Sequence, residues 1–372
     1  MNSHEPHDLN SHPTARPVLI MAGGTGGHIF PGLAVAETLR RQQIPVRWLG
    51  ASGAMECQRV PAAGIPFDVV DISGLRGKGL MRWLRIPTQL FKAVRQAFVL
   101  MGKNRPACAL SFGGYAAGPG GLAARLRGIP LLVHEQNRIP GLTNRVLARL
   151  ARQVFQAFPG TWPERMHPVT SGNPVRAEVT GLAAPAERMK NRTVPLRILV
   201  TGGSQGARAL NQALPLAMGR MKGDRAVEIR HQAGRGNAEE TARSYAEAGV
   251  SAQVDEFIED MAQAYGWADL VVCRSGALTV SELAAAGVAS VLVPFPFAVD
   301  DHQTRNAEYL VEVGAARLLP EPDCRPERLS ELLSELLGDR SELLRMAQAA
   351  RALAMPDAAG QVARACLEIR GA

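Results

Sequence analysis

The 372-residue sequence predicts an α/β protein of two Rossmann-like domains, each built on a parallel sheet, with a cleft between them. Short apolar runs alternate with helix-compatible runs in both halves of the chain, which is typical of parallel sheets covered on both faces. A strand, a glycine turn and a helix start also follow one another once in each half, at 19–31 and 200–207. Such turns direct backbone N–H groups at an anion.

Residues 17–160 are expected to form the N-terminal domain. Its strands are predicted at 18–22, 46–49, 67–72, 108–112, 131–135 and 154–158. Its helices are predicted at 33–41, 88–102, 119–127 and 142–151. The connection that follows is rich in proline and glycine, so we expect residues 161–174 to be an interdomain linker.

Residues 175–354 restart the alternation and are expected to form the C-terminal domain. Its strands are predicted at 197–200, 227–232, 253–257, 270–273 and 290–294. Helices are predicted after 206, after 239, at 260–267, 278–286 and 302–313, and from 325 onward, where leucines recur at helical spacing. A last helix, within 355–372, is expected to pack back on the N-terminal domain. Residues 1–16 are polar, lack the apolar core of a signal peptide and are predicted to be a disordered tail.

The composition is that of a soluble globular protein in a reducing compartment. Hydrophobic residues make up 46% and charged residues 20% of the chain. The 5 cysteines include no CxxC pair, which argues against a disulfide framework or a zinc site. The uncharged run at 107–124 is interrupted by glycines and does not predict a transmembrane helix. We expect neither a metal nor a cofactor.

The basic residues are unevenly distributed. Between residues 72 and 134 there is no Asp or Glu but there are 10 Lys or Arg, which predicts an anionic partner. A mixture of apolar and cationic residues favours the surface of an anionic bilayer. The alternative is a solvated basic helix whose apolar residues face the core, and Leu90, Phe91, Val94 and Phe98 resemble such core residues. RNA binding is disfavoured because aromatic residues are sparse. The predicted membrane patch consists of Leu75, Arg76, Lys78, Leu80, Met81, Arg82, Trp83 and Leu84.

Several residues near predicted turns and the linker suit nucleotide-sugar chemistry. His28 follows the first glycine turn, where it can meet a reacting group. The helix after 273–276 begins with small residues that leave N–H groups for a pyrophosphate, and Glu282 in its first turns can accept both hydroxyls of a ribose. Arg176, just beyond the linker, can reach a phosphate, and residues 300–303 offer polar groups for sugar hydroxyls. The structural alternatives are a plain tight turn, an ordinary helix acid and a solvated arginine.

Two common nucleotide sites are disfavoured. A dinucleotide fold would place an acid about 20 residues after the first glycine turn, but no acid occurs at the end of the second strand before Glu56. A Walker A loop is excluded because neither turn is followed by Lys-Ser/Thr. The chain also contains no D-x-D. A leaving diphosphate would therefore rely on helix N-termini and an arginine, at about 1.5–3 kcal/mol per charge-assisted hydrogen bond.

Seven motifs together resemble glycosyltransferase family 28, a GT-B family, and within it the bacterial N-acetylglucosaminyltransferases of peptidoglycan synthesis. In chain order they are GGTGGHIFPGLAVAE (23–37), SFGGYAAGP (111–119), HEQN (134–137), GLTNRVLA (141–148), GNPVR (172–176), GGSQGAR (202–208) and CRSGALTVSELAAAG (273–287). The resemblance implies inverting transfer of GlcNAc from UDP-GlcNAc to the MurNAc C4 hydroxyl of lipid I, which gives lipid II. It also implies peripheral attachment to the anionic cytoplasmic face of the bacterial inner membrane, with cell-wall and division proteins as candidate partners and no nucleic acid.

The resemblance further implies roles for single residues. His28 matches the general base, the backbone of Ile258 matches the group that reads uracil, and Glu282 matches the ribose contact. The implied acceptor-side residues are Gly113, Gly114, Tyr115 and Glu135. The implied UDP-GlcNAc contacts are Thr25, Gly26, Gly27, Asn137, Arg176, Ser204, Gln205, Ile258, Ala277, Leu278, Thr279, Val280, Ser281, Glu282 and Gln303. The chain departs from the family pattern at Phe297, where similar sequences often carry His.

Three other functions stay open. A dinucleotide oxidoreductase with two glycine loops is disfavoured by the missing acid. A related GT-B enzyme would act on another lipid or on a small-molecule acceptor. A non-catalytic scaffold that binds nucleotide sugars is disfavoured because His28, Arg176 and Glu282 are all present.

Overall fold

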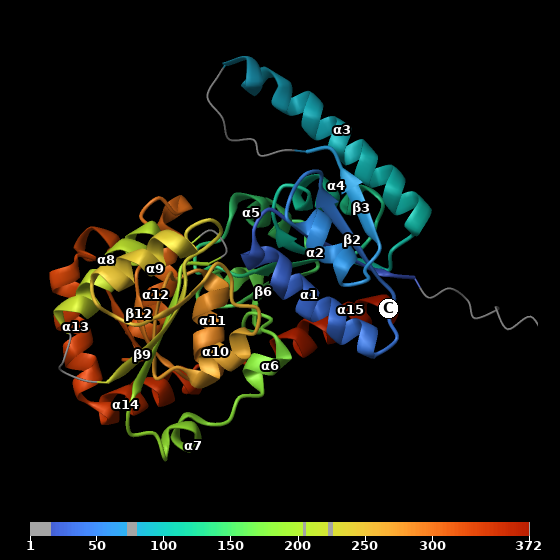
Figure 1. Cartoon of the computed structure of the whole chain (residues 1–372). Coiled ribbons are helices and arrows are strands. Elements are labelled where there is room, and N and C mark those ends of the chain that lie inside the picture. The colour runs from blue at the N-terminus through green and yellow to red at the C-terminus, as the bar shows by residue number, and fades with distance from the viewer. Residues whose placement is uncertain (1–15, 73–79, 204–205, 222–225, 372) are drawn as a thin grey trace, which may run out of the picture. The chain divides into compact units, whose positions relative to one another are not determined.

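The computed structural model describes residues 16–72, 80–203, 206–221 and 226–371, and these form two compact units (Figure 1). The first unit gathers the described residues up to His134 together with 142–153 and those from Val362 on. The second unit comprises 135–141 and 154–361. By contacts, residues 154–361 group with the second unit, and the part of the helix 358–371 from Val362 on groups with the first. Residues 1–15 of the expected tail lie outside the described residues.

The first sheet has seven strands in the order β3-β2-β1-β4-β5-β6-β7. All five residues of β1 are buried, as expected for a central strand that pairs in parallel with β2 and β4. The strands are β1 (Val18–Ala22), β2 (Val46–Ala51), β3 (Phe67–Val70), β4 (Cys108–Gly113), β5 (Leu131–Glu135), β6 (Gln153–Gln156) and β7 (Val169–Thr170). The accompanying helices are α1 (Gly26–Arg41), α2 (Glu56–Ala62), α3 (Leu80–Asn104), α4 (Ala117–Leu126), α5 (Leu142–Ala148) and α15 (Ala358–Gly371).

The second sheet has six parallel strands in the order β10-β9-β8-β11-β12-β13. They are β8 (Leu196–Thr201), β9 (Val227–Gln232), β10 (Gln253–Asp255), β11 (Leu270–Cys273), β12 (Ala289–Leu292) and β13 (Ala316–Leu318). The helices are α6 (Ala177–Thr180), α7 (Pro185–Met189), α8 (Arg208–Arg220), α9 (Ala238–Glu247), α10 (Met261–Trp267), α11 (Ala277–Ala286), α12 (His302–Val311), α13 (Pro326–Gly338) and α14 (Arg340–Ala352). Short 3-10 turns are η1 (Glu164–Met166), η2 (Val299–Asp301) and η3 (Glu321–Asp323). The predicted class, α/β with two parallel sheets, is confirmed.

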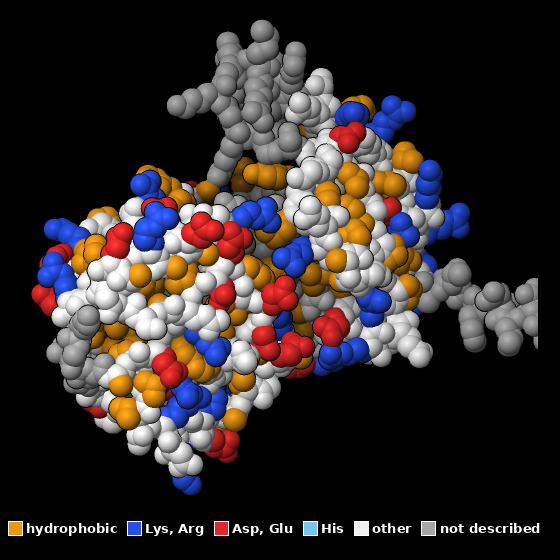
Figure 2. Space-filling model, in the orientation of Figure 1, with side chains coloured by type: hydrophobic (Ala, Val, Ile, Leu, Met, Phe, Trp, Pro, Cys, Tyr) orange, Lys and Arg blue, Asp and Glu red, His pale blue; other side chains and the backbone are white. Residues whose placement is uncertain are grey.

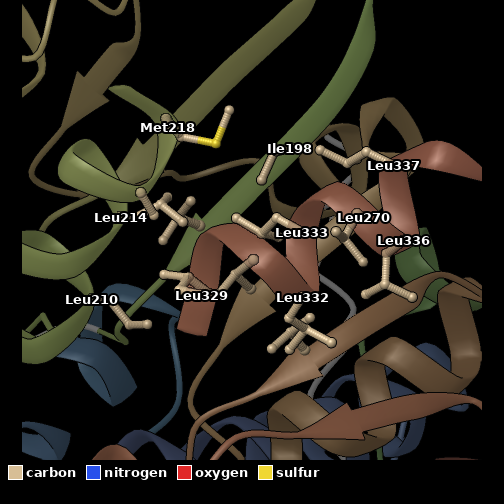
Figure 3. Close-up of a cluster of buried hydrophobic side chains, with 14 of the residues drawn as sticks. Ile198, Leu210, Leu214, Met218, Leu270, Leu329, Leu332, Leu333, Leu336 and Leu337 are labelled. Carbon is tan, nitrogen blue, oxygen red and sulfur yellow. The ribbon is translucent and has the colours of Figure 1, made fainter. Parts of the chain in front are cut away.

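Leucines of α13 form one side of the core of the second unit (Figure 3). They recur at the three- and four-residue spacing of one helix face, so α13 buries them together. Figure 3 shows them beside Leu210, Leu214 and Met218 of α8, with Ile198 of β8 and Leu270 of β11 among them. The labelled residues are Ile198, Leu210, Leu214, Met218, Leu270, Leu329, Leu332, Leu333, Leu336 and Leu337. The helix predicted from residue 325 onward is confirmed.

Several predicted boundaries are wrong. Helix α1 begins at Gly26 rather than at 33, because the glycines that suggested a turn adopt helical geometry. Helix α3 begins at Leu80 rather than at 88. Helix α2 and the two-residue strand β7 were not predicted; α2 contains Pro61 near its end, and β7 is too short to show a pattern.

The interpretation of Phe91 and Phe98 as core residues is also wrong. Their exposed fractions are 71% and 36%, while Leu90 and Val94 are partly buried. The buried face of α3 instead carries Ala93, Ala97 and Met101, four residues apart, and this face packs toward α4. Small alanines allow the two helices to approach closely.

The predicted membrane patch is described only in part. Leu75, Arg76 and Lys78 lie outside the described residues, and for Leu80–Leu84 only the helical backbone is described. Further along α3, Lys92, Arg95 and Lys103 are exposed, and Figure 2 shows Lys and Arg side chains on this surface of the first unit. Among the described helices, none is long and apolar enough to cross a bilayer.

Candidate functional site

Both predicted glycine turns lie where the strand order of a sheet reverses. The reversal occurs between β1 and β4 in the first sheet and between β8 and β11 in the second. Ligands of open parallel sheets bind beyond the carboxyl ends of the strands at such points. In the first unit residues 23–25 and 113–115 flank this position, and in the second unit residues 202, 203, 206 and 274–276 flank it. The topology therefore defines one candidate binding position in each unit.

In the first unit the two flanking loops touch through their glycines. Gly114 has φ +92°, and a Cβ on it would lie 2.3 Å from the carbonyl oxygen of Gly23. Only glycine combines this backbone conformation with so close an approach. Tyr115 is exposed, and its ring lies 3.9 Å from where a Cβ on Gly24 would stand. Gly113, Gly114 and Tyr115 thus lie directly beside the first glycine turn.

The half-buried His28 lies in the first turn of α1, next to Gly26 and Gly27. Its Nδ1 is 3.2 Å from the carbonyl oxygen of Gly23. Because a carbonyl oxygen only accepts, the neutral ring carries its proton on Nδ1 and its lone pair on Nε2. A Cβ on Gly113 would lie 3.6 Å from Nε2, so the glycine leaves space beside that nitrogen. An imidazole oriented in this way can take a proton from a bound group.

Glu56, in the first turn of α2, holds the glycine turn in place. Its side chain is fully buried, Oε2 accepts the Gly24 N–H at 3.1 Å and Oε1 accepts the Ala51 N–H at 3.2 Å. Gly23 must lack a side chain here, since a Cβ would lie 2.2 Å from Oε1. The sequence analysis mentioned Glu56 only because it lies too late in the chain to be the ribose-binding acid of a dinucleotide fold. A signal that could have found it is that Glu56 is the one acid in the sequence between the end of β2 and the end of α2.

In the second unit, Glu135 shapes the loop that carries Asn137. Glu135 is buried, and its Oε1 accepts both the backbone N–H of Asn137 at 3.0 Å and its Nδ2–H at 3.2 Å. The other oxygen accepts the Gly141 N–H at 3.1 Å. These contacts are all within residues 135–141, so Glu135 orders its own loop.

Asn306 of α12, which sequence reasoning missed, joins this loop to the start of α11. It is fully buried, and its Nδ2 donates to Asn137 Oδ1 at 3.2 Å and to the Ser275 carbonyl oxygen at 3.3 Å. Its Oδ1 accepts the Arg138 N–H at 2.9 Å. Arg138 in turn pairs with Glu312 at 2.8 Å, and this hydrogen bond lowers the pKa of the Glu312 carboxyl.

The second glycine turn is held against the end of β9. Gly206 has φ +75°, and a Cβ would lie 2.0 Å from the Ala233 carbonyl oxygen. Gln232 donates from Nε2 to the Gly203 carbonyl oxygen at 2.9 Å and accepts the Ile258 N–H at 3.2 Å. The Ile258 N–H is therefore already engaged in this structure. Ser204 and Gln205, predicted as donor contacts, lie outside the described residues.

Helix α11 begins at Ala277, directly after Gly276. Its first N–H groups have no partner within the helix, as at any helix N-terminus, and face the position beyond β11. Val280 is buried in the core, and the Ser281 hydroxyl donates back to the Ala277 carbonyl oxygen at 2.9 Å. Backbone groups of 277–279 are therefore better placed than these side chains to meet an anion.

Glu282, on the same helix, is brought together with Arg176. Glu282 is only 5% exposed, and its Oε1 is 4.0 Å from Arg176 Nε. Its Oε2 accepts the hydroxyl of Tyr265 at 3.1 Å. Burial raises the pKa of the Glu282 carboxyl, while Arg176 and the Tyr265 hydroxyl act to lower it. The sequence predicted Arg176 and Glu282 separately and did not predict Tyr265.

Gln303 closes the loop after β12. Its Oε1 accepts the Phe295 N–H at 2.9 Å, so its amide NH2 is the group that it can offer to a sugar. Phe297 in the same loop is exposed. Among residues 16–72, 80–203, 206–221 and 226–371, no group of three His, Cys, Asp or Glu side chains is arranged to hold a metal ion.

Comparison with known protein families assigns both halves of the chain. The glycosyltransferase family 28 N-terminal domain matches residues 18–156, and the C-terminal domain of the same family matches residues 197–362. The chain belongs to glycosyltransferase family 28. Residues 157–196 lie between the two family 28 matches, and this interval contains β7, α6, α7 and Arg176.

Family 28 relatives match over nearly the whole chain. One from Xanthomonas axonopodis pv. citri is 58% identical over 96% of this chain and 83% of its own length. One from Xylella fastidiosa is 54% identical over 95% of this chain and 96% of its own length. Both are named UDP-N-acetylglucosamine–N-acetylmuramyl-(pentapeptide) pyrophosphoryl-undecaprenol N-acetylglucosamine transferase.

Solved structures support the same family 28 assignment. The crystal structure of Acinetobacter baumannii MurG superimposes with a TM-score of 0.83 at 43% identity, covering 95% of this chain and 99% of that one. A UDP-GlcNAc 2-epimerase from Neisseria meningitidis has a TM-score of 0.63 at 13% identity, which shows a shared fold alone. The GT-B fold implied by the sequence motifs is confirmed.

Proposed function

We propose that this chain transfers GlcNAc from UDP-GlcNAc to the C4 hydroxyl of MurNAc in lipid I, undecaprenyl-pyrophosphoryl-MurNAc-pentapeptide, to form lipid II in peptidoglycan synthesis. The observation that carries the proposal is the identity of 54–58% to transferases named for this reaction, over at least 95% of the chain. In the reaction the acceptor oxygen forms a bond to the anomeric carbon of GlcNAc, the bond from that carbon to UDP breaks, and the configuration inverts.

The nucleotide part of the donor is assigned to the second unit. The backbone N–H groups at the start of α11 and the Arg176 guanidinium offer positive charge for the diphosphate. Glu282 offers a buried carboxylate oxygen for the ribose hydroxyls, and Ile258 lies beside the glycine turn for the uracil. Asn137 and Gln303 are assigned to the sugar. Thr25, Gly26 and Gly27 of the first unit are assigned to the donor and to the border of the acceptor diphosphate on the family resemblance alone.

His28 is assigned as the general base. Its Nε2 lone pair takes the proton of the MurNAc C4 hydroxyl as the new glycosidic bond forms, a role that contributes about 10²–10⁴-fold to a rate. The proton thus ends on His28, and the electron pair of the broken bond leaves with UDP. Gly113, Gly114, Tyr115 and Glu135 are assigned to the acceptor side, which for the first three is supported by their position beside His28 and Gly24.

Departure of UDP adds negative charge to the diphosphate. Hydrogen bonds from the α11 N-terminus and from Arg176 stabilise that charge, each by about 1.5–3 kcal/mol. Because Arg176 is 4.0 Å from Glu282, the ribose and diphosphate contacts are coupled. Replacing His28 with Ala is therefore expected to reduce turnover far more than UDP-GlcNAc affinity, and an unchanged turnover would remove His28 from the role of base.

Peripheral attachment to the anionic cytoplasmic face of the inner membrane is also part of the proposal. It is supported by the acid-free sequence at 72–134 and by the exposed Lys92, Arg95 and Phe91 on α3. Each cation near such a surface contributes about 1 kcal/mol. Interaction with cell-wall and division proteins rests on the family resemblance alone.

The test is transfer of labelled GlcNAc from UDP-GlcNAc to a lipid I analogue, with and without EDTA. Transfer that survives EDTA would support both the donor–acceptor pair and stabilisation of the leaving diphosphate by protein groups. Tight UDP-GlcNAc binding without transfer to lipid I would contradict the acceptor assignment and favour another acceptor or a scaffold. Failure to bind UDP-GlcNAc would contradict the whole proposal.

A further inference from the structure

We propose that Tyr265 is a positioning residue for nucleotide recognition, because its hydroxyl fixes the orientation of Glu282 and keeps that carboxylate ready for the ribose. This inference rests on the proposed function, in which Glu282 binds the ribose hydroxyls of UDP-GlcNAc. Tyr265 belongs to α10 and lies outside every motif that the sequence analysis identified.

The geometry of the pair leaves one oxygen of Glu282 for a ligand. Tyr265 is 1% exposed, and its hydroxyl donates to Glu282 Oε2 at 3.1 Å. Burial and the neighbouring Glu282 raise the pKa of the Tyr265 hydroxyl well above its ordinary value, so this hydroxyl keeps its proton and remains a donor. Within the described part of the chain, Glu282 Oε1 is buried and accepts no hydrogen bond. The tyrosine therefore occupies one oxygen and directs the other.

The charge of Glu282 depends on few neighbours. The titratable and charged groups that face it are Tyr265 from α10, Cys273 at the end of β11 and Arg176 from the segment before α6. Burial raises the pKa of the Cys273 thiol, so that group remains neutral. Burial also raises the pKa of Glu282, and only Arg176 and Tyr265 oppose that change.

Loss of the Tyr265 hydroxyl would therefore affect binding in two ways. The carboxylate would lose the hydrogen bond that orients it, and its pKa would rise further, since one of the two groups that stabilise the charged form would be gone. A protonated carboxyl has fewer acceptor sites for two ribose hydroxyls. The effect must then depend on pH and on the presence of ribose hydroxyls in the ligand.

The experiment compares UDP with 2′,3′-dideoxy-UDP, which cannot donate from the ribose, by calorimetric titration of the full chain between pH 6 and 9. For Tyr265→Phe we expect UDP affinity at pH 7 to fall about 10-fold or more, the lower end for a lost hydrogen bond to a charged group. The loss should shrink as pH rises, because Glu282 ionises again. Affinity for the dideoxy analogue should remain close to that of the wild type, and KM for UDP-GlcNAc should rise with kcat nearly unchanged.

Tyr245→Phe is the matched control. Tyr245 is also 1% exposed, and its hydroxyl makes one buried hydrogen bond in the same unit, to His231 Nδ1 at 3.0 Å. This variant should leave the ratio of UDP affinity to dideoxy-UDP affinity, and the dependence of that ratio on pH, as in the wild type. Equal loss of affinity for UDP and for the dideoxy analogue in Tyr265→Phe would mean a merely structural role and would overturn the inference.

Glu282→Gln separates failure of the inference from failure of the proposed function. If Glu282→Gln weakens UDP but not the dideoxy analogue, the ribose assignment holds, and Tyr265→Phe should then add no further loss in that background. If Glu282→Gln has this effect but Tyr265→Phe shows the wild-type pH profile of UDP binding, the inference about Tyr265 is overturned and the proposed function is not. UDP affinity unchanged by Glu282→Gln overturns the nucleotide assignment and this inference with it.

Discussion

Acidification is expected to destabilise the second unit through His231, which is buried at the end of β9. Its Nδ1 accepts the Tyr245 hydroxyl at 3.0 Å, and its Nε2–H donates to Asn211 Oδ1 at 3.0 Å. The Asn211 amide donates to the Ala233 carbonyl oxygen at 2.9 Å, which fixes this tautomer. Ala233 is the residue against which Gly206 of the second glycine turn packs. The network therefore connects the fold to the candidate nucleotide site.

The size of the effect follows from the pKa of the ring. Burial lowers the pKa of His231 from 6.5 to about 3. The unfolded chain then binds the proton more readily than the folded chain, so this contribution to stability is complete above pH 6.5 and is lost as pH falls toward 3. At pH 5, about 1.5 pH units below the ordinary pKa, the loss is about 2 kcal/mol at 1.36 kcal/mol per unit.

The measurement is the free energy of unfolding of the second unit in urea at pH 7.5, 6 and 5, with hydrogen exchange of β8 and β9 peptides identifying that unit. His231→Gln should be less stable than the wild type at pH 7.5 but should lose about 2 kcal/mol less between pH 7.5 and 5. His167→Asn, at an exposed position, is the control and should follow the wild type. The reasoning is refuted if His231→Gln loses as much stability on acidification as the wild type.

Three further substitutions test other contacts. Glu56→Ala should cost about 1–3 kcal/mol in urea unfolding, because the buried Ala51 N–H loses its acceptor; a cost below about 0.5 kcal/mol would contradict this. Gln232→Leu should weaken UDP binding by about 3- to 10-fold in calorimetry, since its hydrogen bonds to Gly203 of the glycine turn and to Ile258 are lost. Unchanged affinity would show that these two hydrogen bonds are not needed for UDP binding. Phe91→Ser should change the free energy of unfolding by less than about 0.5 kcal/mol because the ring is exposed; a loss above about 2 kcal/mol would restore the core interpretation of this ring.

The fold was predictable to the extent that each strand is a short apolar run bounded by turn residues. The predicted ranges for β1, β5, β9 and β11 match the structure residue for residue. Helix starts were less predictable, because Gly26 and Gly27 disfavour a helix by intrinsic propensity yet begin α1. For α3 the apolar rings suggested a buried face, whereas close packing on α4 selects the alanines at 93 and 97. Tertiary packing overrode hydrophobicity there.

The candidate site was predictable where chemistry is local in sequence. His28 and Glu282 each follow a strand and a turn, so their position could be read from neighbouring residues. Tyr265, Gln232 and Asn306 could not be found in this way, since each acts on a loop that lies elsewhere in the chain. Their signal is a buried polar side chain with its hydrogen-bonding groups engaged at a loop, and burial is not visible in a single sequence.

The two glycine turns look alike in sequence but are held by opposite chemistry, and this difference fits their separate proposed roles. Glu56, after β2, accepts the Gly24 N–H, so an anion at the first turn cannot use that donor. Gln232, at the end of β9, instead donates to the Gly203 carbonyl oxygen and takes no N–H from residues 202 and 203. Both β2 and β9 neighbour the strand that leads into the turn of their own sheet. The same position in two related sheets thus carries an acceptor for an N–H of the first turn, which adjoins the proposed base His28, and a donor to a carbonyl oxygen of the second turn, which adjoins the proposed uracil contact Ile258.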